Sequence, residues 1–380
     1  MHILNFPCVP AAIYISGMVS LVVAVLLAVT KRVHGRLSMD GLCGIQKVHL
    51  QPTPRIGGIA IVAGVIGGWV VSSNDVGQVV GVLIAASVPA FFFGVLEDLT
   101  KRVSVVVRLC ATMASGGLAW WLSGVSLTHV GLPFLDSALG WIPFSVLFTA
   151  FAVGGIANAV NIIDGLNGLA GGFIVVALGG IAVIASFHGD SALVITSLVV
   201  ASAVLGFWLV NWPFGKIFLG DGGSYFGGFA FAWICVLLVE RSSAVSAFAP
   251  VLVCIHPVSE VLFSIYRRKL KKANIGCPDR LHLHSLIMLR CVVRVLLRWN
   301  GGNRQKMLLQ RNSVAGLMLA LMSVPSTLVA VWVADDFRAA LGGCLFFLLV
   351  YVTIYARLVR FRWCSPLSFL LVKRLPQTVD

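Results

Sequence analysis

The sequence predicts an all-α polytopic membrane protein, a transmembrane bundle of about 10–11 membrane-spanning helices. Apolar residues make up 59% of the 380 positions and charged residues only 11%, whereas a soluble globular domain carries about 25% charged residues. A soluble fold of this length could not bury so much apolar surface, but a lipid bilayer accepts it. Apolar runs of about 20 residues, the length that crosses the hydrocarbon core, recur along the chain.

Roughly eleven segments have the length and composition of spanning helices. They are 11–30, 56–72, 77–95, 105–123, 141–157, 168–187, 191–210, 223–239, 244–264, 313–333 and 339–357. The polar string NAVNIIDGLNG interrupts the apolar run between 141 and 187, so the division there is the hardest to place. We expect one integral membrane domain, 1–380, with its motifs in a core at 49–290, C-terminal helices at 313–357 and a cytoplasmic tail at 358–380.

The charge distribution predicts the orientation. All but two of the 28 Lys and Arg residues fall on one side of these spans, and the two exceptions are Arg241 and Arg338. Short loops rich in Lys and Arg remain cytoplasmic, so we expect the N-terminus outside and the C-terminus inside. The net charge of +14 follows from this topology, and no nucleic acid partner is expected.

The longest polar segment, from about 265 to 312, is expected to be a cytoplasmic loop. Within it Arg290, Arg294 and Arg298 are four residues apart with apolar residues between them. This spacing is typical of a helix lying on an anionic membrane surface. The nine cysteines show no CxxC spacing, which argues against a zinc framework or a disulfide scaffold.

Every polar motif falls on the predicted cytoplasmic side. The first, HLQPTPRIGG at 49–58, precedes the second helix. Its prolines hold the chain extended, Gly57 and Gly58 permit close approach of the backbone, and Arg55 is a planar donor suited to phosphate. A helix-entry loop with a topological arginine is the alternative.

The second motif is EDLTK, 97–101, at the inner end of the third helix. Two adjacent carboxylates are costly near lipid. A continued helix would carry Lys101 on the same side as Glu97 and Asp98. The motif indicates cation binding or proton transfer, and a helix-end ion pair is the alternative.

The third motif is NAVNIIDGLNGLAGG, 158–172. On a helix, Asn158, Asn161 and Asp164 share one face, and Asn167 follows among glycines. Four oxygen-bearing side chains inside an apolar stretch favour a binding site, although hydrogen bonding between helices is the alternative.

The fourth motif, FLGDGGSYFGG at 218–228, places Asp221 among glycines, where bare backbone can approach a phosphate or a metal. Oxygen ligands suit magnesium, which takes one or two carboxylates and shares itself with substrate phosphates. A glycine-rich turn with an incidental Asp is the alternative.

The fifth motif is DRLHLHSL, 279–286, in which Arg280, His282 and His284 alternate. An extended segment would aim all three one way, and this set suits a pyrophosphate better than zinc. In the preceding helix His256 and Glu260 are four residues apart, and we expect them to hydrogen-bond within that helix.

Taken together, the five motifs in this order resemble the polyprenyl-phosphate N-acetylhexosamine-1-phosphate transferase superfamily (glycosyltransferase family 4). PTPRIGG and DRLHLH resemble the bacterial undecaprenyl-phosphate N-acetylglucosamine-1-phosphate transferase branch in particular. The resemblance implies an enzyme of the bacterial inner membrane with a cytoplasmic active site. It implies a UDP-N-acetylhexosamine donor, an undecaprenyl phosphate acceptor and release of UMP, which would start a lipid-linked glycan. The sequence does not determine the oligomeric state, and a homodimer is one possibility.

The resemblance also implies residue roles. Asp221 and Asn161 would hold Mg²⁺, with Mn²⁺ as a substitute, and Asp221 would also count among the catalytic residues. Glu97 and Asp98 would stand at the acidic pair tied to the acceptor phosphate, with Lys101 nearby. The substrate-binding residues would be Thr53, Arg55, Asn158, Asp164, Asn167, Arg280, His282 and His284. The family pattern usually opens the acidic pair with Asp, so Glu97 as general base is in doubt.

Two other functions compete with this interpretation. CDP-alcohol phosphatidyltransferases also carry a DG motif in the membrane, but they need a further pair of aspartates downstream, and here the next acid after Asp164 is Asp190, predicted outside. A lipid-linked sugar transporter would usually place charge at mid-membrane, and the motifs here lie on one side.

Overall fold

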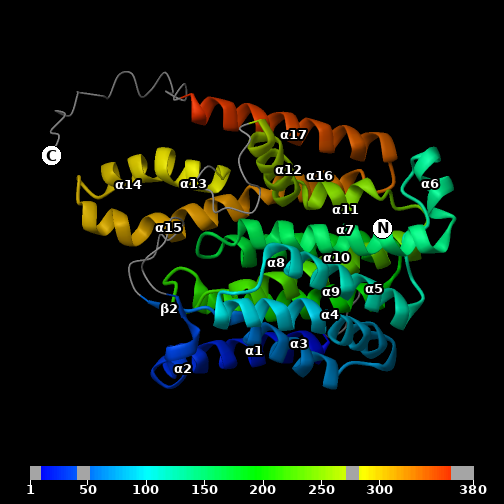
Figure 1. The fold of residues 1–380 in the computed structure, drawn as a ribbon, viewed down its shortest axis with the longest axis horizontal. Coiled ribbons are helices and arrows are strands. Elements are labelled where there is room, and N and C mark those ends of the chain that lie inside the picture. The colour runs from blue at the N-terminus through cyan, green and yellow to red at the C-terminus, as the bar shows by residue number, and fades with distance from the viewer. Residues whose placement is uncertain (1–9, 41–51, 271–281, 361–380) are drawn as a thin grey trace.

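The computed structural model describes residues 10–40, 52–270 and 282–360. Over these residues the protein is a bundle of helices along one long axis (Figure 1). Its strands in this part of the chain form a single short antiparallel pair, β1 (Met39–Asp40) with β2 (Thr53–Pro54). The predicted all-α membrane fold is confirmed. Residues 49–51 of the first motif, Arg280, and the tail beyond 360 lie outside the described residues.

The described helices follow one another along the chain in a fixed order. They are α1 (Ala11–Val29), α2 (Lys31–Ser38), α3 (Gly57–Val70), α4 (Asn74–Thr100), α5 (Val105–Ser123), α6 (Pro133–Leu139), α7 (Ile142–Ile163), α8 (Leu169–Phe187), α9 (Ser191–Asn211), α10 (Gly220–Arg241), α11 (Phe248–Val253), α12 (Ile255–Leu270), α13 (Leu283–Ile287), the π-helical turn η1 (Met288–Val292), α14 (Val293–Trp299), α15 (Arg304–Leu321), α16 (Ser323–Trp332) and α17 (Phe337–Val359).

Each predicted span corresponds to a helix or a pair of helices. In the described part of the chain nine helices are long and apolar enough to cross a membrane, with α15 and α16 counted together. The helix α3, with 14 residues, falls short of that length. The predicted span 244–264 is broken at Cys254 into α11 and α12.

Two predicted boundaries need correction. The helix α7 continues to Ile163, six residues beyond the predicted end, and its polar residues are accommodated there: the Asn158 side chain donates to the Gly154 carbonyl within the helix at 2.8 Å. The helix α10 begins at Gly220 rather than 223, so Asp221 lies in the first turn of a helix and not in a glycine-rich loop.

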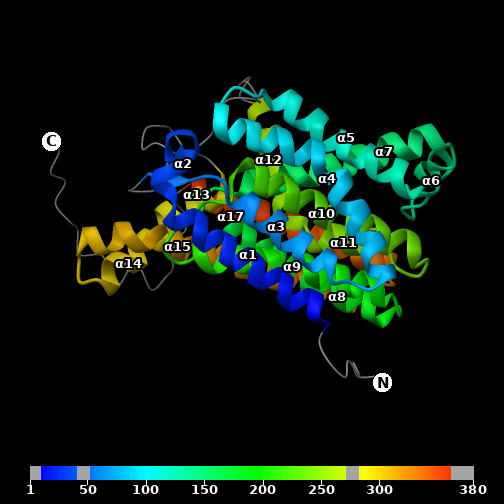
Figure 2. The same cartoon turned by 90° about the horizontal axis from the view of Figure 1, so that it is seen from below.

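The helix α10 is the centre of the bundle, and its membrane-spanning part is fully buried. The helices α4 and α5 lie on one side of it and α8 and α9 on the other (Figure 2). Glycines make this packing close. A Cβ on Gly94 would lie 2.6 Å from the Gly222 Cα, and one on Gly58 would lie 2.4 Å from the Gly223 nitrogen. Small residues let membrane helices approach backbone to backbone, so the ends of α3 and α4 meet the start of α10.

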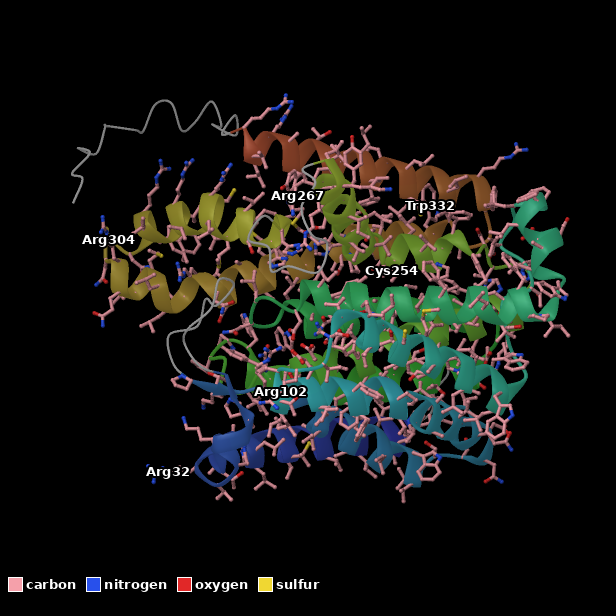
Figure 3. The ribbon with its side chains drawn as sticks, viewed as in Figure 1. Arg32, Arg102, Cys254, Arg267, Arg304 and Trp332 are labelled. Atoms are coloured by element: carbon pink, nitrogen blue, oxygen red, sulfur yellow. The ribbon has the colours of Figure 1, made fainter. Side chains whose placement is uncertain are left out.

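The two ends of the bundle differ in chemistry. One end carries α2, β2 and the side-by-side helices α14 and α15 (Figure 1). Arg32 and Arg304 lie at that end, and Trp332 lies toward the other (Figure 3). At the other end the loops are joined by polar contacts, for example Arg241 with Asp190 at 3.3 Å. The described polar motifs all belong to the first end, as the sequence predicted.

The segment after α13 pairs with a neighbour in the bundle. The helix α14 packs against α15 and buries Leu296, while Val295, Trp299, Arg294 and Arg298 are exposed. The amphipathic pattern is therefore partly used in helix pairing. That its exposed face lies on an anionic membrane surface stays a prediction.

Candidate active site

Asp221 stands at the meeting point of three segments far apart in the chain. Its carboxylate is almost fully buried, and each of its oxygens faces a guanidinium group. The Arg55 Nη2 donates to Oδ1 at 2.9 Å, and Arg108 Nη1 donates to Oδ2. Arg55 precedes α3 and Arg108 lies in the first turn of α5. Two positively charged side chains therefore bind one carboxylate, at the end of the bundle that carries α2 and β2.

Asp98 holds the start of α10 in place. Its Oδ1 accepts from the Asp221 backbone N–H and its Oδ2 accepts from the Gly222 N–H, both at 2.9 Å. The Arg55 Nε lies 3.4 Å from Oδ1. A carboxylate at a helix N-terminus binds free backbone donors and meets the positive end of the helix dipole. The last turn of α4 and the first turn of α10 are thereby joined.

Gly220 makes the contact between the Asp98 carboxylate and the start of α10 sterically possible. Its φ is +76°, in the left-handed region that favours glycine. A Cβ there would lie 2.6 Å from Asp98 Oδ2 and 2.5 Å from the Arg55 carbonyl oxygen. The glycine before Asp221 therefore lets the carboxylate of Asp98 reach the helix start.

The two adjacent acids have different partners. Glu97 is half-buried, and its Oε2 accepts from the Val103 backbone N–H at 2.8 Å, which closes the turn after α4. The helix does not continue to Lys101: it ends at Thr100, and Lys101 is exposed with φ of 56°. The expectation of a helix that continues to Lys101 is wrong, because Lys101 adopts the left-handed conformation and ends the helix. That Lys101 lies near the acidic pair stays a prediction.

Asn161 lies beside Asp221 through two residues of α10. Its Nδ2 donates to Ser224 Oγ at 2.8 Å, and Ser224 Oγ donates to the Asp221 carbonyl at 3.2 Å. The Tyr225 hydroxyl donates to Asn161 Oδ1 at 3.3 Å. The predicted pair of oxygen-bearing residues, Asn161 and Asp221, thus occupies neighbouring positions on α7 and α10.

Asp164 caps the C-terminus of α7 in the same region. Burial raises the pKa of its carboxyl to about 7, Arg55 lowers the pKa, and Asp221 and Asp98 raise it further. These electrostatic interactions place Asp164 in the same charged cluster as Arg55, Asp98 and Asp221.

The other two asparagines of the third motif bind neighbouring helices. Asn158 Nδ2 donates to Thr112 Oγ1 of α5 at 2.8 Å, which is the hydrogen bonding between helices left open as the alternative. The Asn167 backbone N–H donates to Asn312 Oδ1 at 2.9 Å, and its Nδ2 donates to Ser313 Oγ at 3.3 Å. The loop after α7 is thereby attached to α15. Thr53, in β2, is buried two residues before Arg55.

The histidines of the fifth motif pack against α12. His282 Nδ1 lies 2.8 Å from Glu260 Oε1, and the rings of His282 and His284 are stacked 5.4 Å apart and 2° from parallel. Burial lowers the pKa of His284 to about 4, so this ring is neutral at neutral pH. The predicted hydrogen bond between His256 and Glu260 is wrong: Glu260 bonds to the later segment, and neither ring nitrogen of His256 has a partner.

Asp221 and Asn161 carry oxygen atoms of the kind that a divalent cation binds, and in this structure those oxygens accept hydrogen bonds from protein side chains. Both carboxylate oxygens of Asp221 point at cationic groups, and Asn161 Oδ1 receives only a long hydrogen bond. Among the described residues no three or more His, Cys, Asp and Glu side chains are arranged to hold a metal by themselves. Magnesium suits such a site because it usually takes one or two protein carboxylates and completes its shell with phosphates and water.

Several site residues were not singled out from the sequence. Arg108 is the clearest, since an arginine four residues into an apolar helix is costly in lipid unless it has a partner. That isolated charge was the available signal, but its partner Asp221 lies 113 residues away. Ser224 and Tyr225 were visible only as part of FLGDGGSYFGG, and nothing in the string distinguishes them from packing residues.

Asp190 has a role away from this site. Its Oδ1 accepts from the Leu193 N–H at the start of α9, and its Oδ2 binds Arg241 at the opposite end of the bundle. The acid that a CDP-alcohol phosphatidyltransferase would need beside Asp164 is therefore elsewhere, which argues against that class.

Comparison with known proteins agrees with the geometry. Residues 80–239, which run from α4 to α10, match the family described as glycosyl transferase family 4. A probable undecaprenyl-phosphate N-acetylglucosaminyl 1-phosphate transferase of Bacillus subtilis is 32% identical over 70% of this chain and 75% of that relative. An undecaprenyl-phosphate alpha-N-acetylglucosaminyl 1-phosphate transferase of Escherichia coli is 30% identical over 64% of this chain and 67% of that relative.

The matched region includes Asp98, Asn161 and Asp221, and the similarity to whole relatives extends well beyond it. The chain therefore belongs to glycosyl transferase family 4, in the branch of the undecaprenyl-phosphate N-acetylglucosaminyl 1-phosphate transferases.

Proposed function

We propose that this protein transfers N-acetylglucosamine-1-phosphate from UDP-N-acetylglucosamine to undecaprenyl phosphate and releases UMP. The names of its relatives support the undecaprenyl phosphate acceptor and the transferred N-acetylglucosaminyl 1-phosphate group. The observation that carries the proposal is the cluster at the N-terminus of α10, where Arg55 and Arg108 both bind Asp221. A site that brings two polyanions together needs cationic groups held on a rigid support, and Arg55 and Arg108 are two such groups.

The reaction is a phosphoryl transfer. An oxygen of the lipid phosphate attacks the β-phosphorus of the donor in line, the bond from that phosphorus to the bridging oxygen breaks, and UMP leaves with the oxygen. Catalysis of this kind consists mainly of positioning and charge stabilisation. Arg55 and Arg108 can bind phosphate oxygens as planar donors, and Asp98 holds the helix start that carries Asp221.

Magnesium belongs to the same proposal. Asp221 and Asn161 are the residues that would hold it, and the ion would supply positive charge shared between protein and phosphates. Asp221 already orients both arginines, so the carboxylate organises the cationic side chains as well.

The membrane position explains why the site lies at one end of the bundle. The prenyl tail stays in lipid while the nucleotide comes from the aqueous phase. We place the site on the cytoplasmic face of the inner membrane. With the predicted spans, all but two of the chain's Lys and Arg residues fall on this side, and loops rich in Lys and Arg remain cytoplasmic.

Cysteine labelling tests this orientation. In a cysteine-free background, single cysteines at 75 and 336, both exposed, are expected to react with a membrane-impermeant maleimide added outside intact spheroplasts. Cysteines at 102 and 304, exposed at the other end, are expected to react only after the membrane is opened. The reverse labelling would contradict both the topology and the cytoplasmic site.

Release of UMP tests the reaction itself. Purified protein in detergent with undecaprenyl phosphate is expected to release UMP from UDP-N-acetylglucosamine, and to release none when the lipid phosphate is left out. UDP-N-acetylgalactosamine and CDP-diacylglycerol serve as comparison donors. Release of CMP from the latter would support the alternative class, and absence of UMP release from every UDP-sugar would contradict the proposal.

A further inference from the structure

Glu260 is a buried carboxylate outside the Asp221 cluster, in the N-terminal half of α12. It is 1% exposed. Its Oε1 lies 2.8 Å from His282 Nδ1, and Oε1 and Oε2 accept from the Leu283 backbone N–H at 3.2 and 3.1 Å. Burying a carboxylate is costly unless hydrogen bonds and charge compensate it. All of these partners lie 22 or 23 residues ahead in the chain, so Glu260 fixes the segment that carries the fifth motif.

The contact determines the chemical state of the His282 ring. A carboxylate accepts hydrogen bonds, so Nδ1 must carry the proton that lies between the two groups. The side-chain hydrogen bonds of His282 in the described structure all involve Nδ1, with Ser264 Oγ as a second neighbour at 3.4 Å. Nε2 is therefore the ring nitrogen left for a ligand. This is the arrangement by which a carboxylate orients a functional histidine in other sites.

The ring pair also reaches the loop that follows α7. His284 stacks on His282, and a Cβ built on Gly165 would lie 2.7 Å from His284 Nε2. Gly165 is the neighbour of Asp164, which belongs to the charged cluster around Asp221. His284 is buried, with no partner for Nδ1. Its neutral ring therefore lies between His282 and this loop.

A purely intrahelical role for Glu260 does not agree with these contacts. His256, one turn earlier on the same helix, has no hydrogen bond to either ring nitrogen. The carboxylate bonds instead to His282 and Leu283. Glu260 thus directs its hydrogen bonds toward the motif that follows α12.

We propose that Glu260 is a positioning residue, which acts through His282 by fixing the ring with Nε2 presented to the β-phosphate of the nucleotide-sugar donor. To donate to a phosphate oxygen, Nε2 must carry a second proton, and the Glu260 carboxylate compensates the resulting positive charge. This inference rests on the proposed function for the identity of the donor. It assigns a role to a residue that does not itself touch the substrate.

Nucleotide binding tests the proposal without depending on turnover. Calorimetry on detergent-solubilised protein compares UDP-N-acetylglucosamine with UMP, which lacks the β-phosphate. Removal of a residue that orients a metal-binding histidine typically costs about 10–100-fold in affinity or activity, and we take the lower end of that range for a histidine that binds phosphate. Glu260→Gln is therefore expected to weaken binding of UDP-N-acetylglucosamine by about tenfold or more and to leave binding of UMP unchanged.

A double-mutant cycle separates positioning from a general structural role. If Glu260 acts through His282, Glu260→Gln is expected to add nothing to the loss caused by His282→Ala. Glu240→Gln is the matched control, since Glu240 also accepts two hydrogen bonds, from Thr128, at the opposite end of the bundle. It is expected to bind both nucleotides as the wild type does. Additive losses, or equal losses for UDP-N-acetylglucosamine and UMP, would overturn the proposal.

A second variant keeps the test valid if Glu260→Gln does not fold. His282→Asn places an amide N–H near the position of Nδ1, so it can keep the bond to Glu260 while removing Nε2. It is expected to retain the thermal stability of the wild type and to lose affinity for UDP-N-acetylglucosamine only. Wild-type affinity in this variant would contradict the role of Nε2. A wild-type protein that binds the donor but releases no UMP would contradict the proposed reaction alone.

Discussion

Asp221→Asn is expected to lower UMP release by about a thousandfold, which corresponds to about 4 kcal/mol of transition-state stabilisation. Asparagine keeps the shape of the side chain but removes the negative charge that faces Arg55 and Arg108. It also removes the charged ligand of the proposed magnesium site. The start of α10 should stay in place, because Asp98 binds the backbone N–H groups and not the side chain of Asp221. The measurement is the rate of UMP release from protein extracted at normal yield.

The matched control for this change is Asp190→Asn. Asp190 is also an aspartate at a helix start with an arginine partner, Arg241, but it lies at the opposite end of the bundle. It is expected to leave turnover near the wild-type rate. Wild-type activity should vanish with EDTA and return with Mg²⁺ or Mn²⁺. An Asp221→Asn enzyme with more than a tenth of normal turnover would remove Asp221 from the reacting centre.

Asp98→Asn is expected to reduce both stability and activity. The carboxylate offers one oxygen to each of two backbone N–H groups, whereas an amide has one acceptor and would turn its own N–H toward the other. Leaving a buried donor unsatisfied costs about 1–3 kcal/mol, and the change also removes the charge opposite Arg55. A shift of about 1 Å at a reacting group can cost about a hundredfold in rate. We therefore expect a lower melting temperature and at least that loss of UMP release.

Glu97→Gln is the comparison within the same acidic pair. Glutamine keeps an acceptor for the Val103 N–H, so the turn after α4 should survive and the melting temperature should change little. If Glu97 manages the acceptor phosphate, the change lowers the rate more than it weakens binding of the UDP-sugar. A larger loss of stability in Glu97→Gln than in Asp98→Asn would contradict the division of roles between the two acids.

Composition and local pattern were enough to predict the fold class and most of the helices. A bilayer requires a long apolar run for each crossing, and such a run can be recognised from consecutive residues of the sequence. The motifs were equally readable, since Asp221, Asn161 and Asp164 are polar groups in apolar surroundings that need an explanation. The errors came at helix ends: α7 extends past 157, where the Asn158 side chain bonds within the helix, and α4 stops at Thr100, where Lys101 adopts the left-handed conformation.

The partners of these residues were decided by the tertiary structure. Nothing local distinguishes Glu97 from Asp98, yet one closes a turn and the other caps α10, because neighbouring side chains on a helix point about 100° apart. The pairing of Arg108 with Asp221 joins residues 113 positions apart, and that of Glu260 with His282 crosses 22. Such pairs depend on which helices pack together. Here the glycines of α4 and α10 allow these two helices to approach closely. The sequence by itself determined the chemistry present at the site, and only helix packing decided which charge faces which.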